Sequence, residues 1–263
     1  MISLTARNGG DMTDIIMHGC NGRMGQMITN IVKDDEDAHR VAGIDIADSI
    51  KTNPYPVYTD IDLCDKDADV VIDFSSVAAI DNLLDYCEGR KLPLVLCSTG
   101  LSDEHLNRVA ELSQKIPILK SPNMSLGINV LLKAIKEVSK TLIPEGFDVE
   151  IIEQHHRTKV DAPSGTALAL ADAINDEFDD TFEYVYDRTG FRRKRGDREI
   201  GISAVRGGSI VGDHQVIFAG LDEVITIQHS AYSRAIFAKG AVAAAKFLKG
   251  KGPGLYNMSD VIG

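Results

Sequence analysis

The sequence predicts an α/β protein with a Rossmann-like, parallel-sheet domain followed by a second α+β domain with an open mixed sheet. In the first half, short apolar runs alternate with stretches of helical apolar spacing, and a glycine-rich turn follows the first run. After residue 125, alternating segments joined by glycine-rich turns replace that pattern. We therefore expect a first domain over residues 1–125 and 234–263, and a second domain over 126–233.

Parallel strands of the first domain are predicted at five apolar runs: Asp14–His18, Val41–Asp45, Asp69–Phe74, Leu92–Ser98 and Ile116–Lys120. The spacing of apolar residues between these runs predicts helices at Gln26–Val32, Ala78–Glu88 and Asp103–Ser113. The Ala-rich stretch Arg234–Leu248 predicts a helix whose small side chains allow close packing, and we expect it to return to this domain.

The second domain is predicted to begin with a helix from Leu126, because apolar residues recur on one helical face as far as Leu142. Ser164 is the expected N-cap of a second helix. Strands are predicted at Val149–Gln154, Gly201–Val205, Asp213–Ala219 and Glu223–His229.

Composition excludes several classes of protein. The net charge of −11 disfavours a nucleic-acid partner, since phosphate would be repelled. No apolar run approaches the roughly 20 residues of a membrane helix. Residues 1–12 lack the features of a secretory signal, so we expect a disordered lead-in, with Met1 or Met12 as the start. The scattered cysteines predict reduced thiols and a cytoplasmic protein.

The segment from Gly19 to Gly25 has the pattern G-x-x-G-x-x-G between a predicted strand and helix. Glycine lets such a turn reverse and approach a pyrophosphate at the helix N-terminus. Asp45 is placed to accept hydrogen bonds from the adenosine ribose. We expect cofactor contacts from Gly19, Cys20, Asn21, Gly22, Arg23, Met24 and Asp45. The alternative is an ordinary strand-to-helix turn.

Two further strand ends are expected to line the nicotinamide side, because ligands of open α/β sheets bind beyond the carboxyl ends of the strands. These are Cys97, Ser98 and Thr99, and Ser121, Pro122, Asn123 and Met124, with tight turns as the alternative. The Asp45 carboxylate, followed by Ile46 and not by arginine, would repel a ribose 2′-phosphate. NADH is therefore favoured, and NADPH stays possible because Arg23 can contact a phosphate.

The segment from His155 to Thr166 concentrates chemically active groups where a strand leads into a helix. His155, His156 and Lys159 repel one another when protonated, which suits proton donors facing an anionic substrate. The N–H groups of Gly165 and Thr166 and the helix dipole form an anion seat suited to a carboxylate. A solvated loop is the alternative. No metal site is expected, because adjacent strand histidines point to opposite faces.

The stretch from Glu150 to Ala167, with its His-His-x-x-Lys-x-Asp-Ala-Pro-Ser-Gly-Thr core, resembles the 4-hydroxy-tetrahydrodipicolinate (dihydrodipicolinate) reductase family. The resemblance covers nearly the whole chain from Asp14, and its further motifs are Gly22–Gly25, Asn123–Asn129, Ala204–Gly208 and His229–Gly240. It implies reduction of that dicarboxylate by NAD(P)H to tetrahydrodipicolinate, in lysine and diaminopimelate biosynthesis. It also implies a homotetramer assembled through the sheet of the second domain.

Carried over by motif, the resemblance assigns proton donation to His155 and Lys159, and binding of the substrate carboxylates to His156, Gly165 and Thr166. Two alternatives remain. Another nicotinamide-dependent dehydrogenase on this architecture, such as a semialdehyde dehydrogenase, would use Cys97 as nucleophile. A non-catalytic dinucleotide sensor would not need Lys159. The basic run Arg192–Arg195 is interpreted as a surface loop, with a lid over the substrate as the second possibility.

Overall fold

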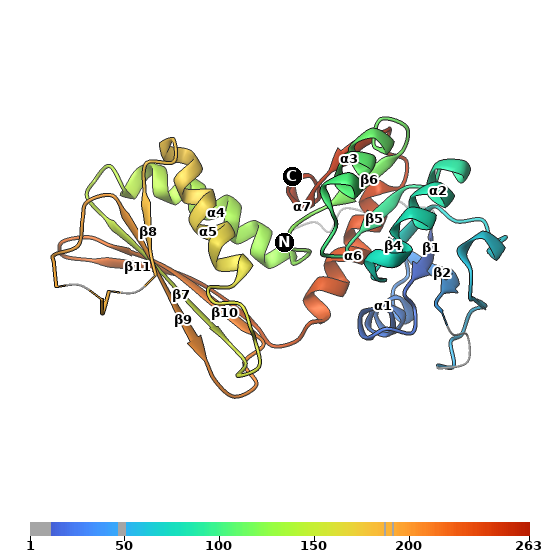
Figure 1. Ribbon diagram of the computed structural model, residues 1–263, viewed down its shortest axis with the longest axis horizontal. Helices are drawn as coiled ribbons and strands as arrows, with labels where there is room; N and C mark the ends of the chain where they lie inside the picture. The colour runs from blue at the N-terminus through green and yellow to red at the C-terminus, as the bar shows by residue number, and fades with distance from the viewer. Residues whose placement is uncertain (1–11, 47–50, 187, 191) are drawn as a thin grey trace, which may run out of the picture. The chain divides into compact units, whose positions relative to one another are not determined.

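The computed structural model describes residues 12–46, 51–186, 188–190 and 192–263. The predicted lead-in and the question of Met1 as the start concern residues 1–11, which lie outside the described part. The chain divides into two compact units, Met1–Met124 with Ala235–Gly263, and Ser125–Arg234. Figure 1 shows a sheet in each of them.

The first unit is built on a seven-stranded sheet in the order β12-β6-β5-β4-β1-β2-β3. Every pairing in it is parallel, which requires a crossover between successive strands. Its strands are β1 (Thr13–His18), β2 (Ala38–Ile44), β3 (Val57–Tyr58), β4 (Val70–Asp73), β5 (Leu94–Leu96), β6 (Pro117–Lys120) and β12 (Gly254–Tyr256). The predicted parallel sheet is thereby confirmed.

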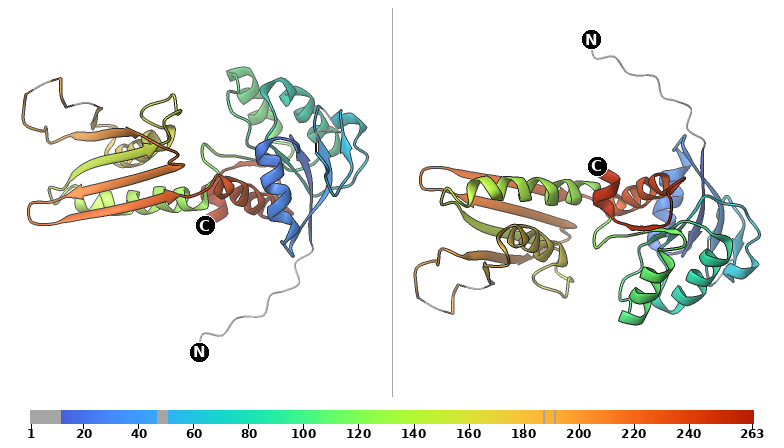
Figure 2. Two further views of the ribbon diagram at one scale, coloured as in Figure 1. Left: turned by 90° about the horizontal axis from the view of Figure 1, so that it is seen from below. Right: turned by 90° about the horizontal axis from the view of Figure 1, so that it is seen from above.

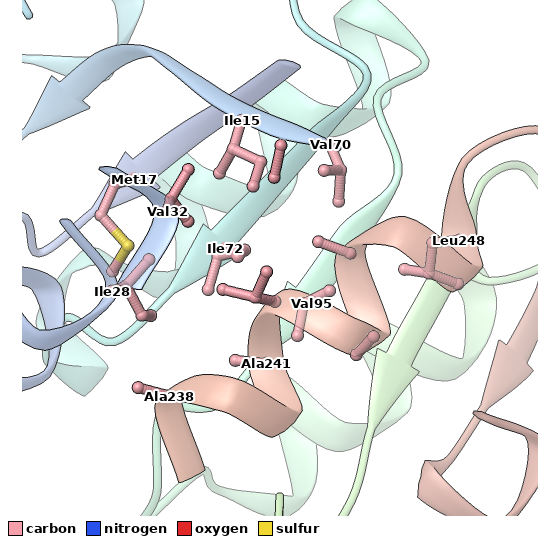
Figure 3. Packing of buried hydrophobic residues seen from close by; sticks show 14 of the residues in the cluster. Ile15, Met17, Ile28, Val32, Val70, Ile72, Val95, Ala238, Ala241 and Leu248 are labelled. Atoms are coloured by element: carbon pink, nitrogen blue, oxygen red, sulfur yellow. The ribbon is translucent and has the colours of Figure 1, made fainter. Parts of the chain in front are cut away.

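The helices of this unit are α1 (Arg23–Lys33), α2 (Ile80–Arg90), α3 (Asp103–Leu112), α6 (Ala235–Leu248) and α7 (Met258–Ile262), with short 3₁₀ turns η1 (Ile61–Leu63) and η2 (Val77–Ala79). All except α7, which follows the last strand, lie between strands in chain order and contribute to the crossovers. Figure 3 shows Ala238 and Ala241 of α6 packed near Ile72 and Val95 of the sheet. Small side chains let this helix lie close to the strands, as the Ala-rich sequence predicts.

The second unit has a five-stranded mixed sheet in the order β11-β10-β7-β9-β8. β7 pairs antiparallel with β10 and parallel with β9, so it occupies the centre of the sheet. The strands are β7 (Asp148–His155), β8 (Glu183–Val185), β9 (Glu199–Arg206), β10 (Gly212–Ala219) and β11 (Val224–Ala231). The predicted mixed sheet is also confirmed.

Two long helices, α4 (Leu126–Leu142) and α5 (Gly165–Asn175), lie on one face of this sheet, as the views in Figure 2 show, and η3 (Asp176–Phe178) extends α5. Along β7 buried and half-buried residues alternate, because successive side chains of a strand point to opposite faces. Val149 and Ile151 therefore face the helices, and Glu153 and His155 continue the same row. Polar side chains thus end a strand face that begins apolar.

Three short strands, β3, β8 and β12, were not predicted from the sequence. Each has only two or three residues, too few for an alternating pattern to stand out. In the described part of the chain, no helix has the length and apolar character that a membrane crossing would require.

Candidate active site

The glycine turn after β1 takes a shape that depends on glycine. Gly19 has φ +81°, and a Cβ there would lie 2.6 Å from the carbonyl oxygen of Phe74. A Cβ on Gly25 would lie 2.3 Å from the carbonyl oxygen of Gly19, so glycine also lets α1 approach the turn. The first-turn N–H groups of a helix have no acceptor within the helix. The turn therefore offers backbone donors to an anion.

A cavity of about 600 Å³ opens beside this turn. Gly19, Asn21, Gly22 and Asp45 line it, as expected for part of a dinucleotide site. Cys20 is instead fully buried, and Met24 packs against the hydrophobic core, so neither lines this cavity. The exposed Arg23 begins α1 beside the turn.

Asp45 follows directly after β2, one residue beyond the strand in which the sequence placed it. Its Oδ2 accepts a hydrogen bond from the backbone N–H of Asn21 at 2.9 Å. This contact fixes the carboxylate at the mouth of the glycine turn. Asp60 lines the same cavity, and none of the described lining residues is a lysine or arginine. The cavity is therefore lined by the carboxylates of Asp45 and Asp60 without a lysine or arginine among the described lining residues to balance them.

In the second unit, His155 is the last residue of β7 and is 8% exposed. Its Nδ1 lies 2.7 Å from Oε2 of the fully buried Glu153. The carboxylate accepts the Nδ1–H hydrogen bond, which leaves Nε2 as the ring atom open to a ligand. Gly212 of β10 lies beside that atom, since a Cβ there would be 3.0 Å from His155 Nε2. The absence of a side chain at Gly212 keeps Nε2 accessible.

Lys159 lies in the loop after β7, where its N–H donates to the carbonyl of His156. Its Nζ forms an ion pair of 2.8 Å with Oδ1 of Asp161. The mutual repulsion that the sequence analysis expects among protonated His155, His156 and Lys159 stays a prediction, and the structure adds the partners of two of these groups. His155 and Lys159 each face a carboxylate, because Glu153 and Asp161 lie within hydrogen-bonding distance.

The predicted helix start is present: Ser164 caps α5, and its Oγ accepts a hydrogen bond from the Ala167 N–H at 3.2 Å. Gly165 is exposed and Thr166 half-buried at the beginning of the helix, where the positive end of the helix dipole lies. His156 is half-buried in the loop before it, with Nδ1 2.9 Å from Oγ1 of Thr158. Gly165 and Thr166 thus lie at a helix N-terminus able to hold an anion.

Comparison with known families gives a match over both units. Residues 13–124 match the model described as "Dihydrodipicolinate reductase, N-terminus", and residues 127–262 match the corresponding C-terminus model. The chain belongs to the dihydrodipicolinate reductase family. The predicted family and reductase class are confirmed, and enzymes of this family use NAD(P)H.

Two curated relatives, both named 4-hydroxy-tetrahydrodipicolinate reductase, are similar over nearly their whole length. The protein of Caldanaerobacter subterraneus is 53% identical over 95% of this chain and 98% of its own. The protein of Clostridium tetani is 52% identical over 95% of this chain and 97% of its own. A solved structure, the dipicolinate-bound reductase of Paenisporosarcina, aligns with TM-score 0.79 and 24% identity, covering 95% of this chain and 99% of its own. It supports the fold.

The other two strand ends predicted for the family's cofactor do not line the described cavity. Cys97 and Ser98 follow β5, with Ser98 donating to the carbonyl of Ser75 and Thr99 exposed. Ser121, Pro122 and Asn123 follow β6, and Met124 is buried in the core. All of them follow carboxyl ends of parallel strands, so they lie along the same sheet edge as the glycine turn.

The competing dehydrogenase mechanism required Cys97 as a thiolate nucleophile. Burial, reinforced by the charge of Asp73, raises the pKa of the Cys97 thiol well above its ordinary value. A thiol held in its neutral form is a poor nucleophile. This observation weighs against acyl-transfer chemistry at this residue.

A pair of buried polar residues in the first unit was missed by the sequence reasoning. His18 Nδ1 lies 2.8 Å from Oδ1 of Asp73, which also accepts hydrogen bonds from the backbone and hydroxyl of Ser75. His18 and Ser75 line the cavity. The rule that ligands bind at carboxyl strand ends would have found this pair had it been applied to β4 as well.

The basic run Arg192–Arg195 is not a lid over the candidate site in the part described. Arg193 pairs with Glu199, and Arg195 pairs with Asp148 at 2.7 Å, at the opposite end of β7 from His155. Hydrogen bonds from Arg188 and Arg193 lower the pKa of Glu199 to about 2, so that carboxylate stays charged.

The described residues contain no group of His, Cys, Asp or Glu able to hold a metal ion.

Proposed function

We propose that this chain binds the cyclic dicarboxylate derived from 4-hydroxy-tetrahydrodipicolinate at the loop between β7 and α5, and reduces it to tetrahydrodipicolinate. Family membership supplies the reaction. The observation that supports the location is the His155–Glu153 pair next to the capped N-terminus of α5. A proton donor and an anion seat are the two groups that reduction of an anionic imine needs.

For the cofactor, we propose that the glycine turn holds the pyrophosphate and that Asp45 accepts hydrogen bonds from the adenosine ribose. The reduced nicotinamide supplies the hydride. Of the remaining candidates, Cys20 and Met24 contribute through their backbone, since their side chains are buried or packed in the core. The proposed contacts from Arg23 and from residues 97–99 and 121–124 extend the site along the carboxyl edge.

We favour NADH over NADPH as the physiological donor. Asp45 and Asp60 both line the cavity, and a ribose 2′-phosphate would bring a doubly charged group close to them. Steady-state kinetics with each cofactor test this preference. A lower KM for NADPH than for NADH would contradict it.

For the substrate, we propose that His155 Nε2 and Lys159 Nζ deliver the proton, while His156 and the N–H groups of Gly165 and Thr166 bind the carboxylates. Lys159 Nζ then exchanges its pairing with the exposed Asp161 for a position beside the anionic substrate, to which it can donate the proton. The ammonium group keeps a negative charge nearby in both positions, so the exchange costs less than desolvating a free ammonium.

The decisive assay follows the absorbance of reduced cofactor with freshly prepared 4-hydroxy-tetrahydrodipicolinate. We expect oxidation of NADH to depend on both the substrate and the enzyme. Failure of the purified protein to oxidise either NADH or NADPH would overturn the proposed function. Retention of cofactor binding under those conditions would favour a dinucleotide sensor instead.

We also propose a homotetramer assembled through the face of the five-stranded sheet opposite α4 and α5. Val205 and Val224 are 45% and 62% exposed. Exposed apolar side chains on an uncovered sheet face are typical of an interface. Sedimentation velocity should give the mass of four chains, and Val224→Glu should give smaller species. Wild-type protein that sediments as a monomer would contradict the proposal.

We also propose that the enzyme is cytoplasmic. The free cysteines Cys20, Cys64, Cys87 and Cys97 fit the reducing conditions of that compartment.

A further inference from the structure

A row of polar side chains crosses the helix-covered face of the second unit's sheet. Glu153 of β7 lies opposite His214 of β10, and His214 lies opposite His229 of β11. Glu153 is fully buried and His214 is 4% exposed. Buried polar groups cost free energy unless they are hydrogen-bonded, so the partners of this row indicate what it does.

The Glu153 carboxylate is saturated with hydrogen bonds. Oε2 accepts from Nδ1 of His155 and from Arg206 Nη1, each at 2.7 Å. Oε1 accepts from Arg206 Nη2 at 2.7 Å and from the backbone N–H of Ser164 at 3.0 Å. Arg206 Nη2 also donates to the carbonyl of Asp161 at 2.6 Å. One carboxylate therefore joins the strand, the N-cap of α5 and, through Arg206, the loop between them.

Glu153 remains a carboxylate in this environment. Burial would raise the pKa of Glu153, but hydrogen bonds from Arg206, His155 and the Ser164 backbone together bring it below its ordinary value. An ionised carboxylate only accepts hydrogen bonds, so the proton of a neutral His155 ring resides on Nδ1. When the ring is doubly protonated, Nε2–H is left as the proton to donate.

His214 also contacts the N-terminus of α5, through the hydroxyl of its N-cap residue Ser164. Ser164 Oγ accepts from the Ala167 N–H, so its own hydrogen is free to donate to His214 Nε2 at 3.0 Å. Burial, helped by the nearby His155, lowers the pKa of His214 to about 4, which keeps the ring neutral and able to accept. The two rings also meet edge to face, with centroids 5.2 Å apart.

We propose that Glu153 is a positioning residue that fixes the ring of His155 and the N-terminus of α5 in one geometry, with His214 anchoring the helix alone. The proposal rests on the proposed function, because it gives that geometry a purpose. Loss of Glu153 should impair both proton delivery and carboxylate binding. Loss of the His214 acceptor should impair carboxylate binding more than proton delivery.

Glu153→Gln tests this assignment. The amide can accept through only one atom, so it cannot serve both His155 and Ser164 and also pair with Arg206. We expect kcat/KM to fall about 10- to 100-fold, the usual range when the partner that orients a functional histidine is lost. In this variant kcat should fall, and the inhibition constant of dipicolinate, used as an unreactive dicarboxylate probe, should rise. In His214→Phe the inhibition constant should also rise, while kcat changes less.

Glu150→Gln is the matched control, because Glu150 lies on the same strand but on the opposite face, paired with Arg188 at 2.7 Å. Its kcat should stay near the wild-type value. If Glu153→Gln does not fold, as judged by circular dichroism, the double variant Glu153→Gln/Arg206→Gln is measured in its place, because it also removes the half-buried Arg206 charge that would be left without its carboxylate.

Nitrogen NMR of the histidine rings gives a measurement independent of turnover. In the wild type, the neutral His155 ring should carry its proton on Nδ1, and in Glu153→Gln the signal should shift towards the other tautomer. The His155 signals are assigned by their disappearance from the spectrum of the His155→Asn variant. A folded Glu153→Gln protein with unchanged tautomer and unchanged kcat would overturn the proposal. A wild type that shows the Nδ1–H tautomer but reduces no substrate would instead contradict the proposed function.

Discussion

In the first unit the candidate cofactor site lies at the edge of the sheet and is shaped by backbone, whereas in the second unit the candidate substrate site extends into the sheet and is made of side chains. Gly19 contributes a left-handed turn. Glu153, by contrast, places a charge on a strand face that begins with the apolar Val149 and Ile151. Backbone recognises a cofactor through N–H groups and close approach, while proton transfer requires titratable side chains.

This difference predicts where each unit is vulnerable. The first should lose function when a side chain is added where glycine is needed. The second should lose function when a polar group is removed, because its partners would remain buried without hydrogen bonds. Five measurements separate the two kinds of damage, from the largest expected effect to the smallest.

Removal of the Lys159 amine should have the largest effect. Lys159→Ala is expected to lower kcat about 10²- to 10⁴-fold, the range for loss of a general acid, while the Kd for NADH stays unchanged. Arg157→Ala, an exposed cation in the same loop, is the control and should leave kcat near the wild-type value. Full activity of Lys159→Ala would remove this residue from the mechanism.

Acid should destabilise the second unit through His214. Its pKa is about 4 in the folded protein and about 6.5 in the unfolded chain, so below pH 6.5 the unfolded state takes up the proton first. The free energy of unfolding should therefore fall by about 3 kcal/mol between pH 6.5 and 4, relative to His214→Gln.

Chemical denaturation of both proteins across this range measures the difference. The pKa of His229 is also lowered by burial and contributes in the same direction in both proteins. Parallel pH dependence of wild type and variant would show that His214 is not the group responsible.

Addition of a methyl group at Gly19 should damage the first unit. The Cβ of Gly19→Ala would collide with the Phe74 carbonyl and would require a left-handed backbone. We expect a loss of about 2 kcal/mol in the free energy of unfolding and weaker NADH binding. Gly89→Ala, with no atom within 4 Å of its Cβ, is the control. Unchanged NADH affinity in Gly19→Ala would contradict the proposed cofactor contact.

The same kind of substitution in the second unit should affect turnover more than stability. In Gly212→Ala the new Cβ lies 3.0 Å from His155 Nε2 and crowds the proton-donating atom. We expect kcat to fall about tenfold, within the contribution of a general acid. Gly207→Ala, whose Cβ meets no atom within 4 Å, serves for comparison. Equal kcat values for the two variants would argue against delivery of the proton from Nε2.

The smallest expected change concerns cofactor preference. Asp45→Asn removes one carboxylate from the cavity and should lower the KM for NADPH relative to NADH about fivefold, as expected for one partly exposed charge. Asp62→Asn, an exposed acid outside the lining, should leave the ratio unchanged. An unaltered ratio in Asp45→Asn would show that other residues select the cofactor.

Much of the fold follows from local sequence patterns. The five predicted strands of the first unit correspond to β1, β2, β4, β5 and β6, and the four predicted in the second correspond to β7, β9, β10 and β11. These segments are long enough for periodicity to be visible. The glycine turn and the segment from His155 to Thr166 were also apparent, because their members lie within a few residues of one another.

The sequence by itself thus determined the fold class, the reductase family and the groups proposed for chemistry, since each is encoded by neighbouring residues. Tertiary structure alone decided that Glu153, Arg206 and His214 meet around His155. These contacts arise because β7 lies between β9 and β10, and strand order is set by packing over long sequence separations. The partners of the basic run were decided in the same way, because Arg195 meets Asp148 only once β7 and β9 are paired.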